Sequence, residues 1–438
     1  MINLSIIIPI GKHEDDFKLI KQIKQKFKGC EIILVVDEEN KIIAQEKIEV
    51  DQLYLLRNSS RAKALNKGIN LSTRDILWLL HLDSDIKNVN PSDLNSLNKY
   101  AVTTFLLKFN EANCWLIAAG ANFRTKIFCI PFGDQSFLIS KKLFNFIGPF
   151  NESLLEGEDH EFIWRMKSLN IKLNIVNKHI ITSAKKYLGN KIYQNIRTLS
   201  KTFVQAIKFR KKKKSVVLAT FLKNPKSNES KSRLRRELNN EFVNQLNEKF
   251  INITNQNLKR LNNKNKIQFI KVCKDKDEEN LKLFSNIHQG KFLNQNQDLN
   301  LVMSEVSELA LRTVGKVALL GSDIPTLNSK DLNEVFLDKL DKDNFFFQTD
   351  DGGFCFMFSK DQNIIKCLNK IKSSSNSVIK TLSSCLNKVN ISEKIYFDVD
   401  VALDLKKVYE QLKLNETNVT NEQKDLLDFL RSNEKMFI

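Results

Sequence analysis

The feature that most constrains the fold is a series of short apolar runs, several of which end in an acidic residue. In the first half these runs are LSIIIPI (4–10), EIILVVD (31–37), LYLL (53–56) and DILWLLHLD (75–83). Segments with helical spacing separate them, such as the one that aligns Phe17, Ile20, Ile23 and Phe27. Near-continuous apolar strands that alternate with helices predict an α/β fold with a parallel sheet covered on both faces. Ligands of such sheets bind beyond the carboxyl ends of the strands.

The second half repeats this pattern. Apolar strands are expected at SVVLATFL (215–222), at KVALLGSD (316–323) and at FFFQTDDGGF (345–354), although no residue-level repeat connects the halves. A chain of 438 residues is long enough for two or three domains. We therefore expect domains at 1–212 and 213–410, followed by a helical C-terminal tail at 411–438.

The net charge of +18, with a pI near 9.4, favours a polyanionic partner. The bias towards Lys, Asn and Ile with few Gly and Pro is also typical of AT-rich genomes, so part of the excess is solvated surface. No basic stripe interleaved with aromatics, zinc knuckle or recognition helix indicates nucleic-acid binding. Two interpretations fit the basic run Lys211, Lys212, Lys213 and Lys214. It contacts anionic lipid, with a binding free energy of about 1 kcal/mol per Lys, or it is a solvated linker, which we favour.

The seven cysteines are scattered without a C-x-x-C pair, which predicts reduced thiols rather than disulfides or a zinc site. The N-terminus lacks the pattern of a signal peptide, and no apolar run approaches 18 residues. We therefore expect a cytoplasmic protein, at most peripheral to the inner face of a membrane.

Two acidic segments in the first half suggest chemistry. Asp83 and Asp85 follow an apolar strand, where carboxylates can hold a hard divalent cation that bridges two phosphates. This spacing is also common in turns and caps. The segment LLEGEDHEFIWRM (154–166) has four acids at the start of a helix, which the helix dipole favours. Four acids exceed the needs of capping, so one of them is a candidate general base for an acceptor hydroxyl.

The first half resembles glycosyltransferase family 2, which has the GT-A fold, over about residues 3–210. Seven segments agree in order: SIIIPI, VVDEEN, RAKALNKG, LLHLDSD, GDQSFLISKKLFNFIGPF, EGEDHEFIWRM and SAKKYLG. They are most similar to a subgroup with a G-R-A-x-Q-x-N-x-G helix followed by F-L-H-A-D. The resemblance implies a metal-dependent, inverting transfer of a sugar from a nucleotide-diphosphate sugar to a hydroxyl or carboxyl. The acceptor would be a lipid or an isoprenoid such as a carotenoid.

The resemblance also implies roles for individual residues. On the donor side, Asp37 would contact the base or ribose, Arg61 and Asn66 would line the nucleotide pocket, and Asp83 and Asp85 would hold Mg²⁺ or Mn²⁺ with the diphosphate. The acceptor side would comprise Gly133, Asp134 and Gln135, with Asp159 as the catalytic base, Glu158 beside it and Arg165 neutralising the acids. His81 would be structural and His160 a charge partner. The sequence departs from the family at Ser60, Ala64, Lys185, Lys186 and Tyr187, none of which replaces a carboxylate.

Residues 217–405 resemble a second GT-A branch, the nucleotidyltransferases such as the phospholactate and molybdopterin guanylyltransferases. The matching segments are FLKNPKSNESKSRL (221–234), GSDIP (321–325), DGGF (351–354) and DVDVALDL (398–405). The resemblance implies that a triphosphate is held by Lys223, Lys231 and Arg233, and that the acidic site consists of Asp323 and Asp400 as metal ligands with Asp351 and Asp398 nearby. Asn228 replaces a loop glycine, and DLNLVM (298–303) lacks the family's Gly and Arg.

These observations leave three hypotheses. The leading one is a glycosyltransferase in the first half, with two tandem GT-A domains. In the second, the other half is a nucleotidyltransferase that makes the activated sugar, or else a catalytically silent partner. In the third, both halves only bind nucleotides.

Overall fold

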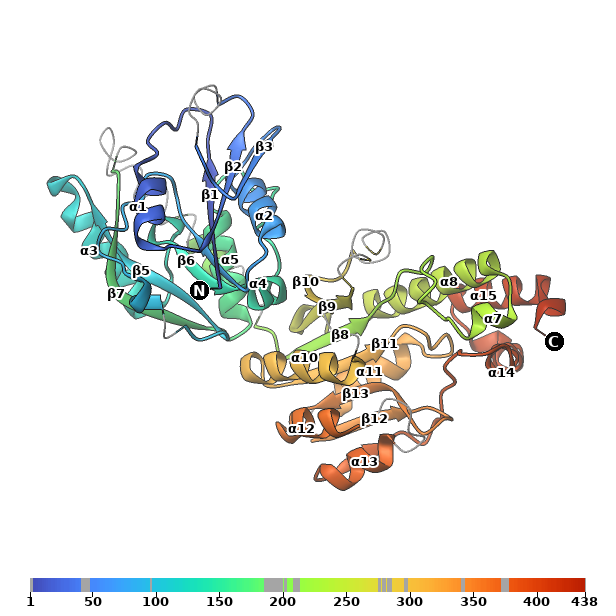
Figure 1. The fold of residues 1–438 in the computed structure, drawn as a ribbon. Coiled ribbons are helices and arrows are strands. Elements are labelled where there is room, and N and C mark those ends of the chain that lie inside the picture. Colours follow the sequence, from blue (N-terminus) through green and yellow to red (C-terminus); the bar gives the residue numbers. More distant parts are fainter. Residues whose placement is uncertain are drawn as a thin grey trace. The chain divides into compact units, whose positions relative to one another are not determined.

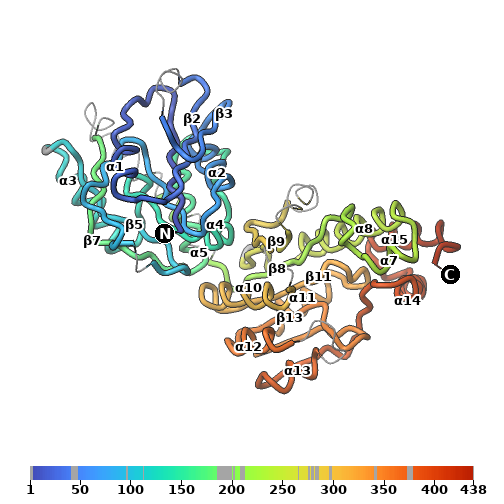
Figure 2. Tube along the Cα trace, in the orientation of Figure 1, coloured from blue at the N-terminus to red at the C-terminus, as the bar shows by residue number. Residues whose placement is uncertain are grey.

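The computed structural model describes residues 3–40, 48–94, 97–184, 200, 203–207, 213–274, 277, 281, 286–294, 298–339, 343–371 and 378–437. The chain divides into two compact units, Met1–Lys213 and Lys214–Ile438 (Figures 1 and 2). Lys185, Lys186, Tyr187, Lys211 and Lys212 lie outside the described residues. No helix in the described part of the chain has the length and apolar character that a membrane span requires.

The first unit is built on a seven-stranded sheet with the order β3-β2-β1-β4-β6-β5-β7. Its strands are β1 (Leu4–Ile10), β2 (Glu31–Asp37), β3 (Gln52–Leu56), β4 (Ile76–Leu79), β5 (Ala101–Phe109), β6 (Phe137–Ser140) and β7 (Lys172–Thr182). Only β6 runs antiparallel to its neighbours, among the pairings described. The strand predicted at 75–83 ends at Leu79, and the residues that follow form a turn. Asp83 therefore lies in a loop beyond the sheet.

Helices cover this sheet as the apolar spacing predicts. They are α1 (Lys18–Lys26), α2 (Arg61–Leu71), α3 (Trp115–Phe128), α4 (Lys141–Ile147) and α5 (Glu158–Ser168). Ile20, Ile23 and Phe27 of the predicted α1 face join the core, where Phe27 packs edge-on against Trp78 at 5.2 Å between ring centroids. Gly68 lets α2 approach β1, because a Cβ atom there would lie 2.5 Å from Ile7 Cγ2.

The second unit has the same topology. Its strands are β8 (Val216–Phe221), β9 (Ile267–Cys273), β10 (Gly290–Leu293), β11 (Val317–Gly321), β12 (Asn344–Gln348), β13 (Phe354–Ser359) and β14 (Val389–Ile391). Their order is β10-β9-β8-β11-β13-β12-β14, with β13 antiparallel to both neighbours. Numbered along each unit, both sheets have the order 3-2-1-4-6-5-7 with an antiparallel sixth strand. The predicted fold class, two Rossmann-like α/β domains in tandem, is confirmed.

The helices of the second unit include two at the C-terminus that belong to its core. The described helices of this unit are α7 (Leu234–Glu237), α8 (Asn240–Lys259), α10 (Leu299–Thr313), α11 (Ser329–Asp338), α12 (Asn363–Lys370), α13 (Val378–Cys385), α14 (Ala402–Leu414) and α15 (Asn421–Ser432). The two at the C-terminus are α14 and α15. Leu426, Leu427 and Leu430 of α15 share one core cluster with Phe242 and Leu246 of α8. Residues 411–438 therefore pack as part of this unit.

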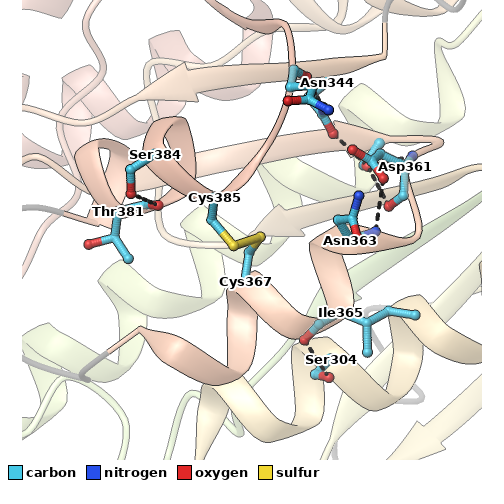
Figure 3. The surroundings of a disulfide bond; sticks show 11 residues. Ser304, Asn344, Asp361, Asn363, Ile365, Cys367, Thr381, Ser384 and Cys385 are labelled. Atoms are coloured by element: carbon cyan, nitrogen blue, oxygen red, sulfur yellow. Dashed lines mark hydrogen bonds between the residues drawn. A yellow bond between two sulfur atoms is a disulfide. The ribbon is translucent and has the colours of Figure 1, made fainter.

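The expectation that all cysteines are thiols is wrong for one pair. A disulfide joins Cys367 of α12 to Cys385 of α13 (Figure 3). The Cα atoms lie 5.8 Å apart although 18 residues separate them in sequence. Only the packing of α12 against α13 brings the two together, so their spacing carried no signal. The other five cysteines form no disulfide.

Candidate functional site

In the first unit, three predicted segments meet at the carboxyl edge of the sheet. His81 and Asp83 follow β4, Gly133 lies in the short 3-10 helix before β6, and Asp159 lies in the first turn of α5. The Gly133 N–H donates to Asp159 Oδ2 at 2.6 Å. A Cβ atom on Gly133 would lie 3.0 Å from that oxygen and 3.2 Å from His81 Nε2. A Cβ atom at this position would be in tight contact with both side chains, so glycine favours this close approach.

Arg61 is the cation of this cluster. From the first position of α2 its Nε donates to Glu158, whose side chain is almost fully buried, and its Nη2 lies 3.6 Å from Asp159 Oδ1. Arg165 Nε pairs with Glu161, another of the four acids of this segment, at 2.8 Å. The reason is helical spacing: residues four apart lie on one face, so Arg165 meets Glu161 rather than Glu158 or Asp159.

The surroundings set the ionisation of Asp159 and His81. Burial disfavours the Asp159 carboxylate, but His160, Arg61 and the N–H groups of Gly133 and His160 outweigh burial and hold its pKa well below the usual range. Burial, followed by the charge of Arg61, lowers the pKa of His81 to about 4. At neutral pH the site therefore combines an ionised Asp159 with a neutral His81.

An aromatic and cationic stack supports the acceptor-side segment. The His160 ring stacks on Phe132 at 3.6 Å between centroids, and the Arg124 guanidinium lies 3.4 Å from the centroid of the Phe132 ring. Sequence reasoning missed Arg124 and Phe132, because their contact with α5 crosses about 30 residues and no local pattern marks it.

The two aspartates of the LDSD segment have different surroundings. Asp83 is exposed and accepts a hydrogen bond from Thr182 Oγ1 at 2.8 Å. The Asp85 carboxylate accepts from Gln22 Nε2 at 3.0 Å and from the Lys87 N–H at 2.9 Å. Through its Oδ1 atom, Asp85 thus fastens its loop to α1.

A divalent cation still fits this edge through Asp83. No three Asp, Glu, His or Cys side chains converge as a metal site within the described residues. However, Mg²⁺ usually takes only one or two carboxylates and completes its shell with water and substrate phosphates. Asp83 would hold the ion together with a diphosphate, and the ion would offset charge on the leaving group.

Other predicted residues mainly hold the site together. The Asn66 amide bonds both the N–H and the C=O of Phe150, at 2.9 Å each, and so ties α2 to that loop. Gln135 is fully buried, where it donates to Phe105 O and accepts from Thr125 Oγ1. These contacts occupy both amides, so neither is directed to a nucleotide or an acceptor.

Asp37 and Asp134 are the remaining predicted carboxylates of the first unit. Asp37 ends β2 and accepts from the Glu39 N–H at 2.9 Å. Asp134 Oδ1 is buried and has no hydrogen-bond partner among the described residues. A buried carboxylate oxygen of this kind normally meets a water or a ligand group.

The cavity at Asp159 is small. It is lined by Arg61, Leu65, Leu79, His81, Gly133, Phe137, Phe150, Glu158 and Asp159. Only about 10 Å³ is open to the centre of a water-sized sphere, which is room for one water molecule. The Asp159 carboxylate is therefore shielded from bulk solvent.

The second unit presents a much wider pocket. All seven residues predicted for its site line one cavity of about 660 Å³: Lys223, Lys231, Arg233, Asp323, Asp351, Asp398 and Asp400. The segments that carry them follow β8, β11, β12 and β14, so the pocket lies at the carboxyl edge of this sheet as well. Its volume is in the range of small-molecule sites.

Lys231 lies between the two predicted metal ligands of this pocket. Its Nζ is 2.8 Å from Asp323 Oδ2 and 3.7 Å from Asp400 Oδ1, while Arg233 Nη1 is 3.2 Å from Asp400 Oδ2. Burial disfavours the Lys231 charge, but Asp323, Asp400 and Asp398 outweigh burial and raise the pKa of Lys231. The site as it stands holds an ammonium where a metal was predicted, so it does not fit a divalent ion in this arrangement.

Asp398 is the carboxyl group of this pocket whose pKa is raised. Burial, followed by the charges of Asp323, Asp351 and Asp400, raises the pKa of Asp398 to about 7. Asp351 is fixed differently, since it accepts from Thr349 Oγ1 at 2.6 Å and from the Gly353 N–H at 2.9 Å. A carboxyl that titrates near neutral pH in a pocket is characteristic of functional sites.

No protein-family model and no curated protein matches this chain. Several solved structures are similar in fold. A structure described as a nucleotide-diphospho-sugar transferase from Desulfovibrio desulfuricans G20 has 20% identity and a TM-score of 0.44, and the match covers 51% of this chain and 97% of that one. A mannosyltransferase from Pyrobaculum calidifontis in complex with GDP-Man and Mn²⁺ has 14% identity and a TM-score of 0.34, covering 47% and 64%.

A 4-diphosphocytidyl-2C-methyl-D-erythritol synthase from Anaerococcus prevotii has 12% identity and a TM-score of 0.31, covering 46% of this chain and 99% of that one. Each match covers about the length of one unit.

Proposed function

We propose that the first unit is a metal-dependent, inverting glycosyltransferase that uses a nucleotide-diphosphate sugar. The observation that carries this proposal is the convergence of Asp159, Arg61 and Gly133 at the carboxyl edge of β4, next to the exposed Asp83. Glycosyltransferase family 2, which the sequence resembles, has a catalytic base and a metal-binding carboxylate in these segments. The Asp37 carboxylate, at the end of β2, is available for the ribose or base.

The transfer is a single in-line displacement. A bond forms between the acceptor oxygen and the anomeric carbon while the bond from that carbon to the diphosphate oxygen breaks. The acceptor proton passes to an oxygen of Asp159, and the nucleoside diphosphate leaves with the electron pair. Arg61 and the Gly133 N–H hold the Asp159 carboxylate in place, which keeps the base aligned with the acceptor.

The low pKa of Asp159 bears on the acceptor. A weak base removes a proton effectively only late in the displacement, when the acceptor oxygen has become acidic. Acceptors that suit this site are a hydroxyl activated in the transition state or a carboxyl group, which is already ionised at neutral pH. A lipid or isoprenoid acceptor is compatible with both.

The test is the variant Asp159→Asn. Because general-base catalysis contributes about 10²- to 10⁴-fold, we expect kcat to fall by that factor while thermal stabilisation by the donor sugar and Mn²⁺ is retained. Glu161→Gln is the matched control, since Glu161 lies in the same helical turn but pairs with Arg165. Equal loss of donor stabilisation and transfer in Asp159→Asn would show a structural role instead.

The second unit has a candidate function of its own, because its seven predicted residues line one pocket. We propose that it binds a nucleoside triphosphate and makes the activated sugar. In that reaction a sugar-phosphate oxygen attacks the α-phosphorus and pyrophosphate leaves. Lys223, Lys231 and Arg233 would contact the phosphates.

A thermal scan with nucleoside triphosphates tests the second unit. A ligand at 100 times its Kd stabilises the native state by about 2.7 kcal/mol. We expect this stabilisation in the wild type and in Lys249→Met, since Lys249 pairs with Asp425 away from the pocket, but not in Lys231→Met. Release of pyrophosphate when a sugar phosphate is added would show that the second unit is catalytically active rather than silent. No response to any triphosphate would refute the proposal.

A further inference from the structure

The outer face of α3 exposes a continuous apolar stripe. Leu116, Phe123 and Ile127 are 64%, 60% and 60% exposed, and Gly120 lies between them. These positions recur every three or four residues, so they share one face of the helix. Trp115 and Phe128, the first and last residues of the helix, are also exposed. Isolated exposed apolar residues are ordinary, but a stripe along one whole helix indicates a binding surface.

The opposite face of α3 packs on the sheet. Ala118 and Ala121 are buried in a cluster with Leu107 and Phe109 of β5. Figure 1 shows α3 beside β5 and β7 in the first unit. The helix is thus anchored by its small residues, while its large apolar residues point away from the core.

One segment of the first unit, residues 162–213, is strongly one-sided in charge. Residues 162–213 contain 14 Lys or Arg and no Asp or Glu, whereas residues 1–96 contain 14 of each kind. The basic segment includes β7, which pairs with β5, the strand beneath α3. Lys108 of β5 and Lys126 of α3 both act on His179 of β7, where they add to burial in lowering its pKa. Cationic side chains therefore lie close to the helix with the apolar stripe.

We propose that α3 is an interfacial helix whose stripe inserts into an anionic lipid bilayer, while the surrounding basic side chains contact the phosphate headgroups. An apolar face rich in Trp, Phe and Leu with Lys and Arg around it is the pattern of helices that lie in a membrane surface. Each Lys or Arg near an anionic leaflet adds to the attraction. Lys108 and Lys126, together with Lys167, whose Nζ donates to Phe128 O at the end of α3, select an anionic surface as the occupant.

The same helix also contacts the loop before β6, which belongs to the candidate active site. Thr125 Oγ1 donates to Gln135 Oε1 at 2.8 Å, and Arg124 Nε donates to Ile130 O at 2.8 Å. Both contacts support the loop that carries Gly133, whose N–H binds Asp159. If the proposed glycosyl transfer is correct, α3 places the acceptor side of the site at the membrane surface, which favours a lipid-borne acceptor.

Vesicle cosedimentation of the full chain tests this proposal. We expect the wild type to bind phosphatidylcholine vesicles that contain 30% phosphatidylglycerol, and to bind pure phosphatidylcholine weakly. The triple variant Leu116→Gln/Phe123→Gln/Ile127→Gln should lower the partition coefficient on anionic vesicles at least tenfold, with an unchanged far-UV spectrum. The control Leu403→Gln/Leu414→Gln alters exposed apolar residues of the second unit and should bind as the wild type does.

Three outcomes would overturn the proposal. In the first, the wild type does not bind anionic vesicles. In the second, the triple variant binds them as strongly as the wild type does. In the third, the wild type binds no vesicle but forms a dimer, and the triple variant is monomeric. The last result would identify a second copy of the chain as the occupant. Vesicle binding needs no donor sugar, so its result is independent of whether the first unit proves to transfer sugar.

Discussion

Burial acts on two carboxyl groups of this protein with opposite outcomes. Around Asp159, the neighbouring His160, Arg61 and two backbone N–H groups compensate for the lost water, so the charged form persists. Around Asp398 the neighbours are the carboxylates of Asp323, Asp351 and Asp400, so burial and repulsion act together against the charge. The residue type is the same in both places, and the neighbours decide its state.

This difference predicts a pH-dependent effect of Asp398→Asn. The folded pKa of Asp398 is about 7, whereas an unfolded Asp titrates near 3.9. Between these values the folded state retains a proton that the unfolded state releases, so the contribution of Asp398 to stability falls as the pH rises from about 4 to about 7. Asparagine mimics the neutral carboxyl and avoids this loss.

We therefore expect the melting temperature of Asp398→Asn, relative to the wild type, to rise across that pH range and to be constant above it. Thermal unfolding between pH 4.5 and 8.5 measures the difference. The control is Asp338→Asn, an exposed position at the end of α11. A variant no more stable than the wild type at pH 8 would contradict the assigned environment.

Among the elements, α12 and α13 depend on a covalent link. The disulfide between Cys367 and Cys385 closes a loop of 18 residues. In the chain-entropy model a loop of this size stabilises the fold by about 3 kcal/mol.

We expect Cys385→Ser to lower the free energy of unfolding by up to about 3 kcal/mol, and a reductant to destabilise the wild type but not this variant. Non-reducing mass spectrometry of peptides identifies the link directly. Equal sensitivity of the wild type and the variant to reductant would contradict the pairing.

Elements also show which sequence predictions succeed. The apolar runs at 4–10 and 31–37 form β1 and β2, because a strand buried on both faces needs an unbroken apolar sequence. The strand predicted at 75–83 extends beyond the end of β4, because the apolar residues Leu80 and Leu82 are buried without being part of the strand. Hydrophobicity reports burial, and burial continues into the turn.

For the whole molecule, the repeated strand order implies two independent cores. Each unit has its own clusters of buried residues, one around Trp78 and another around Phe356. Residues 1–213 and 214–438 each satisfy the requirements of a domain. We propose that they unfold separately.

The expected result for Trp78→Ala is a loss of about 3–5 kcal/mol in the first unit, with the second transition unchanged. Differential scanning calorimetry of the full chain, compared with the separate segments 1–213 and 214–438, measures both transitions. A single transition that shifts as a whole would contradict independent units.

The amino-acid sequence by itself determined the alternation of strands and helices, and it indicated which candidate carboxylates follow a strand and which begin a helix. These are local properties, because apolar runs and helical spacing extend over a few residues. The seven predicted residues of the second unit line one pocket for the same local reason. Each lies in a segment that follows a strand, and the carboxyl ends of these strands lie at the same edge of the sheet.

Only the tertiary structure decided which charged groups meet. It pairs Arg61, rather than Arg165, with Glu158, binds Asp85 to Gln22, and puts Lys231 between Asp323 and Asp400. Most of these partners are separated by about 60 residues or more, so no spacing rule relates them. Distance sets the energy of an ion pair, and distances between remote residues exist only once the sheets and helices have packed.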